Sequence, residues 1–139
     1  MSVKCFDYLP DEAKIIRQKV FVEEQGFIDE FDEADNESLH FLLFVDDKAV
    51  GTCRFLYSKE HECYAIGRFA VLKEYRNKHL GQELMKACEQ EIIKKHGHIR
   101  VGLGAQLQAM LFYQKCGYNA TETRYFEQDC PHVWMEKVL

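Results

Sequence analysis

The sequence has no long apolar run, only two prolines, and no segment in which basic residues gather. Nothing in it approaches the ~20 consecutive apolar residues that span a bilayer, and the N-terminal residues lack the basic and apolar blocks of a signal peptide. The net charge is -5, from 18 basic and 23 acidic residues, whereas a nucleic-acid surface needs a basic stripe. We therefore expect a cytoplasmic protein that binds neither membranes nor nucleic acid.

Paired cysteine motifs are also absent. None of the six cysteines stands at the two-residue spacing of zinc knuckles or thioredoxin-like sites, and we expect all of them to be reduced. Cys53, Cys88 and Cys116 fall inside apolar patterns, which is typical of small core residues. His61 and Cys63 are too sparse to form a metal site. A metal is not expected, and a cysteine or metal enzyme is a remote alternative.

What is present is typical of one folded domain. The 139 residues suit a single core, and we assign residues 1–139 to one domain. The hydrophobic fraction of 47% and the charged fraction of 29% exclude wholesale disorder. Acidic residues crowd between Glu23 and Glu37. The simpler interpretation of the run from Asp29 to Glu37 is a solvated loop, and the alternative is that part of it attracts a cationic amine to a pocket.

Apolar periodicity predicts the order of elements. Spacings of three and four predict a helix over residues 11–22 and a longer helix that starts near Leu80 and ends at Gly97. A third helix is predicted over residues 106–116, where Gly117 ends it. Predicted strands cover residues 41–45, 49–57, 62–72, 99–103, 118–126 and 133–138.

With a further strand before the first helix, these elements predict a mixed α/β (α+β) sheet, in the order strand, helix, three strands, helix, strand, helix, two strands. Residues 46–48 have the length of a hairpin turn, and Gly67 indicates a bulge or a close backbone approach. Residues 62–72, the long helix and residues 99–103 are expected to form a right-handed strand-helix-strand unit.

The start of the long helix carries the strongest chemical signal. Because Arg76 to Gly81 open the helix, their backbone N–H groups are expected to lie free at the positive end of the helix dipole, where a phosphate or diphosphate binds. Arg76 and Lys78 add positive charge, and Gly81 permits a close approach. An ordinary helix start with a surface arginine is the alternative, and the spacing alone does not decide between them.

This segment resembles motif A of the GNAT superfamily, Q/R-x-x-G-x-G/A, with Arg76 first, Gly81 last and His79 in place of the middle glycine. Residues 109–118 resemble the second signature of the family, a helix with an aromatic-Tyr pair that ends at a Gly-aromatic step. Further segments resemble small bacterial GNAT proteins of the ElaA and YjcF types: Glu23-Glu24-Gln25, Ile66-Gly67-Arg68-Phe69-Ala70-Val71, Ala105-Gln106 and Pro131-His132. The resemblance covers nearly the whole chain.

The resemblance implies a GNAT-like acyl-CoA N-acyltransferase fold with splayed central strands. It also implies that the amine attacks acetyl-CoA directly, so that an acetyl group moves to a primary amine of a small molecule or peptide through a tetrahedral intermediate. A homodimer is a further expectation from the resemblance. The pantetheine arm would pair with the strand through Phe69, Ala70 and Val71, whose backbone supplies the oxyanion donor. The implied cofactor-binding residues are Phe69, Ala70, Val71, Arg76, Asn77, Lys78, His79, Leu80, Gly81, Gln82, Gln106 and Tyr113.

Two residues are candidate catalytic groups. Tyr113 matches the family tyrosine near the sulfur and is the expected general acid, because a phenol stays protonated at neutral pH; a tyrosine that merely packs is the alternative. Pro131-His132 resembles the corresponding stretch of glyphosate N-acetyltransferase, so His132 is the expected base. The alternative for His132 is a residue that fixes the turn after Pro131. His40 and Glu24 are lesser candidates, acting through a water.

The sequence gives conflicting indications of the substrate. Arg17, Arg54 and Arg68 would bind an anionic group if they face the cleft, although surface ion pairing is the commoner role of such residues, whereas the acidic run favours a cationic acceptor. Glu24 and His40 complete the candidate substrate-binding set. A catalytically silent CoA-binding or protein-interaction module remains the alternative function, because of His79 and the uncertain base.

Overall fold

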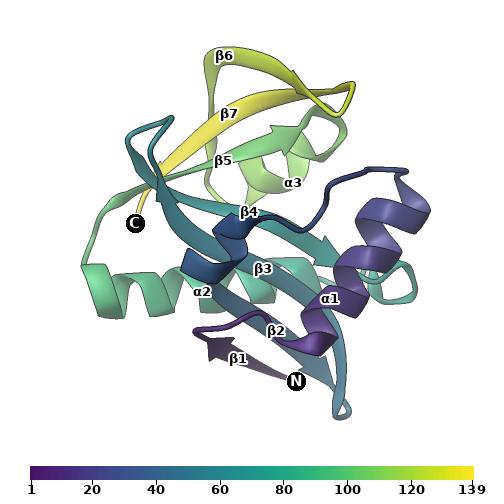
Figure 1. Ribbon diagram of the computed structural model, residues 1–139. Coiled ribbons are helices and arrows are strands. Elements are labelled where there is room, and N and C mark those ends of the chain that lie inside the picture. The colour runs from purple at the N-terminus through teal and green to yellow at the C-terminus, as the bar shows by residue number, and fades with distance from the viewer.

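The computed structural model describes residues 1–139 and contains one mixed seven-stranded sheet with the strand order β1-β2-β3-β4-β5-β7-β6 (Figure 1). The strands are β1 (Ser2–Phe6), β2 (Leu39–Val45), β3 (Lys48–Ser58), β4 (Cys63–Val71), β5 (Arg100–Gln106), β6 (Asn119–Glu127) and β7 (Cys130–Val138). Every neighbouring pair is antiparallel except β4 and β5, which are parallel. The predicted mixed sheet and the predicted order of elements are confirmed.

Two helical layers cover the β2–β4 part of the sheet, α1 in front of it and α2 behind it in the view of Figure 1, while α3 packs on β5 and β6. The helices are α1 (Asp11–Arg17), α2 (Leu80–His96) and α3 (Met110–Lys115), with a π-helix η1 (Gln18–Glu24) and 3-10 turns η2 (Glu33–Glu37), η3 (Lys73–Tyr75) and η4 (Leu107–Ala109). The helix predicted over residues 11–22 therefore changes from α to π at Gln18, and the helix predicted from residue 106 begins as a 3-10 turn.

Local backbone conformation explains where several elements end. Gly97 (φ 80°) and Gly117 (φ 96°) follow α2 and α3 in conformations that suit glycine. The hairpin between β2 and β3 has a loop of only Asp46 and Asp47, at φ 50° and 66°, as in a type I′ turn. Lys48, which we assigned to the turn, is the first residue of β3.

A β-bulge interrupts β4 beside Gly67. Thr52 pairs with Ala70 and Arg54 with Gly67, so one residue of β3 lies opposite two residues of β4, Arg68 and Phe69. The irregularity predicted at Gly67 is confirmed, but the left-handed conformation falls on Arg68 (φ 48°). A non-glycine residue held at positive φ is a local strain of the kind found at functional sites.

The parallel strands β4 and β5 separate soon after they meet. Only Tyr64 with Val101 and Ala65 with Gly102 are paired, although β4 continues to Val71 and β5 to Gln106. Beyond Ala65 the edge of β4 that faces β5 has no strand beside it. The predicted splay of the central strands is confirmed, and it opens the sheet at its centre.

The core fills both sides of the sheet. Twenty-four buried residues form one cluster, with a smaller cluster of three around Trp134. Cys53 and Cys88 belong to the core as expected and Cys116 packs against it, and all six thiols are free. No helix of the chain is long and apolar enough to cross a membrane.

Candidate active site

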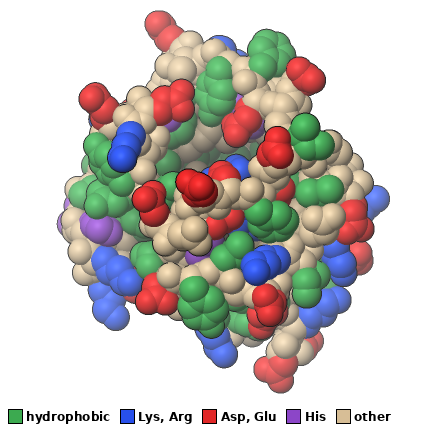
Figure 2. All heavy atoms as spheres, in the orientation of Figure 1, with side chains coloured by type: hydrophobic (Ala, Val, Ile, Leu, Met, Phe, Trp, Pro, Cys, Tyr) green, Lys and Arg blue, Asp and Glu red, His purple; other side chains and the backbone are tan.

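A cavity of about 740 Å³ adjoins the splay between β4 and β5. Its lining comes from the segment after η1, the β3–β4 hairpin, the bulge of β4, β5, α3 and the β6–β7 hairpin. The space-filling view shows the hollow on this face with acidic side chains around its rim (Figure 2). Of the expected site residues, those that line the cavity are Arg54, Arg68, Phe69, Gln106, Tyr113 and His132.

A run of free main-chain donors precedes and opens α2. No hydrogen bond within the protein engages the backbone N–H groups from Asn77 to Gln82; the bonds resume with Glu83, whose N–H donates to the carbonyl of His79 at 3.3 Å. Asn77 (φ 64°) and His79 (φ 61°) are both left-handed. Alternation of this kind turns successive N–H groups towards one point, which makes an anion-binding concavity.

His79 takes the conformation that a glycine would take at that position. Its left-handed backbone is the N-cap of α2, and its side chain caps nothing. The departure from motif A therefore leaves the loop in an αL turn. Gly81 has a different reason to be glycine, because an added Cβ would lie 3.1 Å from the Phe112 ring.

Arg76 is held by the protein itself. Its Nε donates to the carbonyl of Val71 at 2.9 Å, and its two Nη atoms donate to the Glu24 carboxylate at 2.6 and 2.8 Å. The hydrogen bond from Arg76 lowers the pKa of Glu24. Neither residue lines the cavity. This fork fixes the end of η1 to the loop before α2.

Tyr113 reaches the cavity from α3. Its ring packs edge-to-face on Phe69 and Phe112, with centroids 6.1 and 5.1 Å away, and burial raises its pKa above the ordinary value of a phenol. Its hydroxyl makes no hydrogen bond in the protein, and its oxygen is not completely buried, since the residue lines the cavity. A tyrosine with a purely structural role would be expected to satisfy a polar neighbour, so the hydroxyl is available to a ligand in the cavity.

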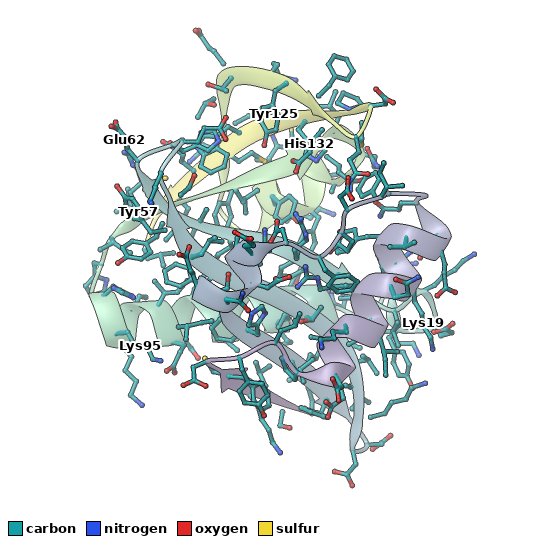
Figure 3. The ribbon with its side chains drawn as sticks, viewed as in Figure 1. Lys19, Tyr57, Glu62, Lys95, Tyr125 and His132 are labelled. Atoms are coloured by element: carbon teal, nitrogen blue, oxygen red, sulfur yellow. The ribbon has the colours of Figure 1, made fainter.

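His132 lies on β7, and its two ring nitrogens have distinct surroundings. Nδ1 is 2.8 Å from the carbonyl oxygen of Cys130, which can only accept, so Nδ1 carries the proton in the neutral ring. Nε2 is then the basic nitrogen, 4.0 Å from an oxygen of Glu127. The ring stacks on Tyr125, with centroids 5.4 Å apart (Figure 3). This arrangement lets Nε2 take a proton from a group in the cavity.

The acidic run is largely folded into the protein rather than solvated. Glu30 and Asp35 are each only 4% exposed, and with Asp32 they bind three arginines. Arg17 donates to Glu30 at 2.9 Å and to Asp35 at 2.8 Å. The simpler interpretation of residues 29–37 as a solvated loop was wrong for these carboxylates, because buried arginines neutralise them.

Arg54 and Arg68 bind the same acidic residues from the sheet. Arg54 donates to Asp32 at 2.7 Å and to Asp35 at 2.9 Å, and Arg68 pairs with Glu30 at 2.9 Å and with Asp32 at 3.3 Å. We refer to Arg17, Arg54, Arg68, Glu30, Asp32 and Asp35 as the ion network. The expectation of surface ion pairing was wrong for Arg17 and Arg54, since both are buried.

The ion network shifts the pKa values of its acids in opposite directions. Burial alone would raise the pKa of Asp35, but the hydrogen bonds and charges of Arg17 and Arg54 outweigh burial and lower it to about 2. Burial dominates at Glu30 and raises its pKa in spite of Arg68 and Arg17. His40 is 1% exposed, binds the carbonyl of Asp35 at 2.8 Å, and has its pKa lowered by burial.

Arg17 is 1% exposed and does not line the cavity, so the condition on which we gave it a substrate contact is not met. His40 and Glu24, which we also assigned to substrate binding, do not line the cavity either. Arg17 instead holds the carboxylates of Glu30 and Asp35, and His40 binds the Asp35 backbone.

Sequence reasoning missed several residues of the cavity. Glu127 and Tyr125 flank His132, while His61 stacks on Trp134 with centroids 3.6 Å apart. Only the residues near His132 could have been found from the sequence, because residues on the two strands of a predicted hairpin face each other. The alternative for the acidic run, that part of it lines a pocket, is confirmed for Glu30 and Glu37. The other missed lining residues include Glu60, Gln25 and Gln128.

A mixed sheet whose parallel central strands splay beside a cavity, followed by a helix start with free N–H groups, defines the acyl-CoA N-acyltransferase class. Residues 7–139 match the acetyltransferase (GNAT) domain family, and the chain belongs to this family.

Relatives place the chain within that family. It is 36% identical to the uncharacterized protein YyaT of Bacillus subtilis, over 92% of this chain and 88% of the relative. It is 34% identical to the uncharacterized N-acetyltransferase YjcF of the same organism, over 91% and 90%. The crystal structure of Escherichia coli ElaA superposes with a TM-score of 0.85 at 27% identity, over 98% of both chains. The resemblance to the YjcF and ElaA types is confirmed.

A more distant structure shares the fold. An acetyltransferase of Bacillus subtilis, solved in complex with CoA, has a TM-score of 0.70 at 18% identity and covers 99% of this chain and 97% of its own.

Proposed function

We propose that the protein transfers the acetyl group of acetyl-CoA to a primary amine of a small molecule or peptide. One observation carries the proposal: the unpaired edge of β4 lies between the free N–H groups of Asn77 to Gln82 and the cavity that holds Tyr113 and His132. A cofactor with a diphosphate at one end and a reactive thioester at the other needs these three features in this order.

The residues present fit such a cofactor. The N–H groups of Asn77 to Gln82 would bind the diphosphate, since a helix start attracts anions. The unpaired edge at Phe69 to Val71 would receive the extended pantetheine arm as an added strand, and a free N–H of this edge would stabilise negative charge on the acyl oxygen. Gln106 lines the same gap from β5 and is held by Gln25 at 2.8 Å.

When bound, acetyl-CoA would supply a thioester carbonyl, to which the amine would add before the C–S bond breaks and the thiol leaves. His132 takes the proton that the amine nitrogen loses, because its Nε2 is unprotonated in the neutral ring. Tyr113 donates its hydroxyl proton to the departing sulfur, and burial keeps the phenol protonated until then. Because both groups line one cavity, the base and the acid would act on the same bound pair of substrates. Direct transfer from the thioester to the amine then requires no covalent enzyme intermediate.

Two measurements test the function in sequence. Acetyl-CoA should raise the melting temperature by mass-action linkage, by an amount that grows with its concentration. Release of free thiol from acetyl-CoA should then depend on an added amine. No thermal shift at saturating acetyl-CoA would contradict the proposal. A shift without thiol release across a broad amine panel would favour the silent CoA-binding module instead.

A further inference from the structure

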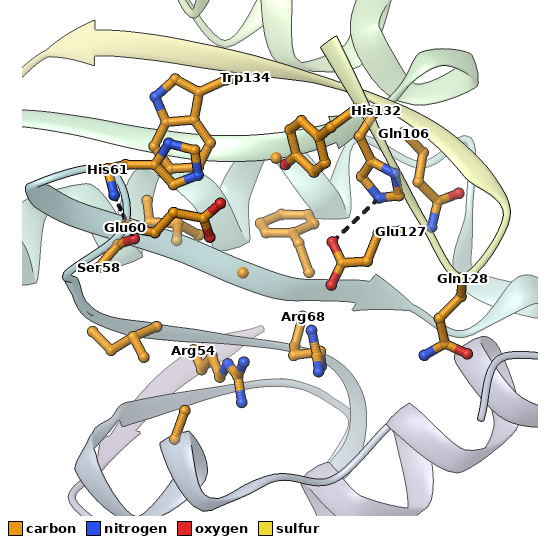
Figure 4. A pocket seen from close by; sticks show the side chains of 18 of the residues that line it. Arg54, Ser58, Glu60, His61, Arg68, Gln106, Glu127, Gln128, His132 and Trp134 are labelled. Atoms are coloured by element: carbon orange, nitrogen blue, oxygen red, sulfur yellow. Dashed lines mark hydrogen bonds and ion pairs between the residues drawn. The ribbon is translucent and has the colours of Figure 1, made fainter. Parts of the chain in front are cut away.

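The two sides of the cavity differ in polar character (Figure 4). Arg54 and Arg68 lie on the side formed by β3 and β4, and His132 and Glu127 lie on the side formed by the β6–β7 hairpin. Hydrogen-bond donors thus face one end of a bound molecule, and a base with a carboxylate faces the other. A ligand that satisfies both sides must carry a hydrogen-bond acceptor or negative charge as well as an amine.

The arginine side holds a donor that the protein does not use. Arg68 binds through Nε and Nη2, while its Nη1 contacts no acceptor. The Nε of Arg54 also has no hydrogen-bond partner, but it is fully buried, so a ligand in the cavity does not reach it. Because Arg68 lines the cavity and its side chain is 20% exposed, its free N–H groups are suited to a ligand oxygen.

The carboxylates of the ion network are already engaged. Both oxygens of Asp32 and both oxygens of Asp35 accept from arginines, and Glu30 binds Arg17 and Arg68. Three arginines pair with the three acids of the ion network, whereas Glu37 of the acidic run lies outside the network and lines the cavity. Burial and the charge of Arg54 lower the pKa of Arg68, as expected of a cation that its partners compensate incompletely.

The bulge of β4 explains why Arg68 reaches the cavity. Its φ of 48° breaks the regular alternation of the strand, and the side chain is 20% exposed although the residue is anchored to Glu30 and Asp32. A planar guanidinium held in this way presents its remaining N–H groups in a fixed direction, which suits a carboxylate better than a flexible ammonium does.

We propose, building on the acetyltransferase function above, that the amine substrate is a small amino-carboxylic acid. Its carboxylate binds the free Nη1 of Arg68, and its amine lies at His132 and Glu127. The cavity of about 740 Å³ has room for a free amino acid beside the thioester end of the cofactor. A simple amine satisfies only the histidine side, and a diamine leaves the free N–H groups of Arg68 without an acceptor.

Binding tests the substrate class without turnover. The protein is saturated with CoA and titrated calorimetrically with the common amino acids, with their carboxamides, and with 1,5-diaminopentane. At least one amino acid should bind about tenfold or more tightly than its carboxamide, because the amide removes the charge that the guanidinium recognises. Equal or tighter binding of every carboxamide, tighter binding of the diamine, or no binding by any amino acid would overturn the inference.

Substitutions test the contact itself. Arg68→Gln should abolish the preference for acid over carboxamide, and Arg68→Lys should restore part of it. Arg17→Gln is the matched control: it removes an arginine from the same ion network but from outside the cavity, so it should lower stability while the preference remains. A preference that survives Arg68→Gln, or that falls equally in Arg17→Gln, would exclude the proposed contact.

The two proposals fail separately. Tight binding of an amino acid without thiol release would retain the carboxylate site and remove the transferase function. Thiol release with amines that lack a carboxylate, at rates equal to those of the matched amino acids, would retain the transferase and remove the substrate class.

Discussion

We propose that Tyr113 is a proton donor rather than a packing residue, because its hydroxyl has no partner in the protein and the residue lines the cavity. Tyr113→Phe should therefore lower kcat by about 100-fold or more, within the usual range of general acid catalysis. The affinity for acetyl-CoA should change less than about twofold, since the ring remains. Steady-state kinetics and calorimetry measure the two quantities.

Tyr118 provides the control for that substitution. It is also buried, but its hydroxyl donates to Glu89 at 2.7 Å and it does not line the cavity. Tyr118→Phe should lower the free energy of unfolding by about 1 kcal/mol and leave kcat near the wild-type value. Equal losses of kcat in both variants would remove Tyr113 from its role.

His79 allows a second prediction at the scale of one residue. Glycine adopts its left-handed conformation without strain, whereas a β-branched residue at positive φ is a steric outlier. His79→Gly should keep the affinity for acetyl-CoA within about threefold, and His79→Val should weaken it by about tenfold, or roughly 1.4 kcal/mol. Calorimetric titration with acetyl-CoA measures the affinity of both variants. If His79→Val bound acetyl-CoA more tightly than His79→Gly, the left-handed loop conformation would not determine the affinity.

At the scale of elements, two glutamines tie the segment after η1 to the other half of the sheet. The side-chain amide of Gln128, in the β6–β7 turn, bonds both the N–H and the carbonyl of Ile28, and Gln106 on β5 bonds Gln25 at 2.8 Å. These contacts join the segments that border the cavity. They form the closure between the segment after η1 and the side of the cavity made by β5 and the β6–β7 turn.

Gln128→Ala should loosen this closure locally. Exchange of the Ile28 amide hydrogen should accelerate by about tenfold, while the free energy of unfolding falls by no more than about 1 kcal/mol, since both bonds are exposed. Gln128→Glu should accelerate it as well, because a carboxylate cannot donate to the Ile28 carbonyl. Unchanged exchange in both variants would mean that the contact contributes nothing to the closure.

Much of the element scale could be predicted from the sequence. Apolar periodicity gave the order of strands and helices, Gly97 and Gly117 ended their helices, and the residues of motif A placed the start of α2. The change to a π-helix at Gln18 had no signal, because its side chains follow the same apolar spacing as an α-helix. The bulge was located to Gly67 but not to Arg68, since only β3 pairing determines which residue is extra.

The candidate site was predictable in its local parts only. The residues from Arg76 to Gln82 are contiguous, so the sequence displays them. The ion network joins residues 13 to 38 positions apart, and no spacing rule reveals such pairs. For that reason we read residues 29–37 as a solvated loop, and the arginines as surface groups.

At the scale of the whole molecule, the ion network predicts how stability depends on pH. The pKa of Asp35 is lowered to about 2 in the folded protein, so between about pH 4 and pH 2 the unfolded chain binds more protons there than the folded chain does. Stability from this group is complete above pH 4 and is lost as the pH falls through 2. Its contribution is on the order of 2 kcal/mol.

Urea unfolding at several pH values measures this dependence. The wild-type free energy of unfolding should fall between pH 4 and pH 2, and Asp35→Asn should be less stable at neutral pH but less sensitive to pH over that interval. Glu30 acts in the opposite sense, since burial raises its pKa and protonation then favours the folded state. An Asp35→Asn variant with the full wild-type slope would contradict the assignment.

The account rests most heavily on the main-chain donors of Asn77 to Gln82. A crystal structure of the protein with bound CoA tests them directly. The account predicts diphosphate oxygens within ~3.2 Å of several of these backbone nitrogens, with the thiol directed along β4 towards Tyr113. A diphosphate bound elsewhere, or held only by side chains while these nitrogens stay without a partner, would contradict it.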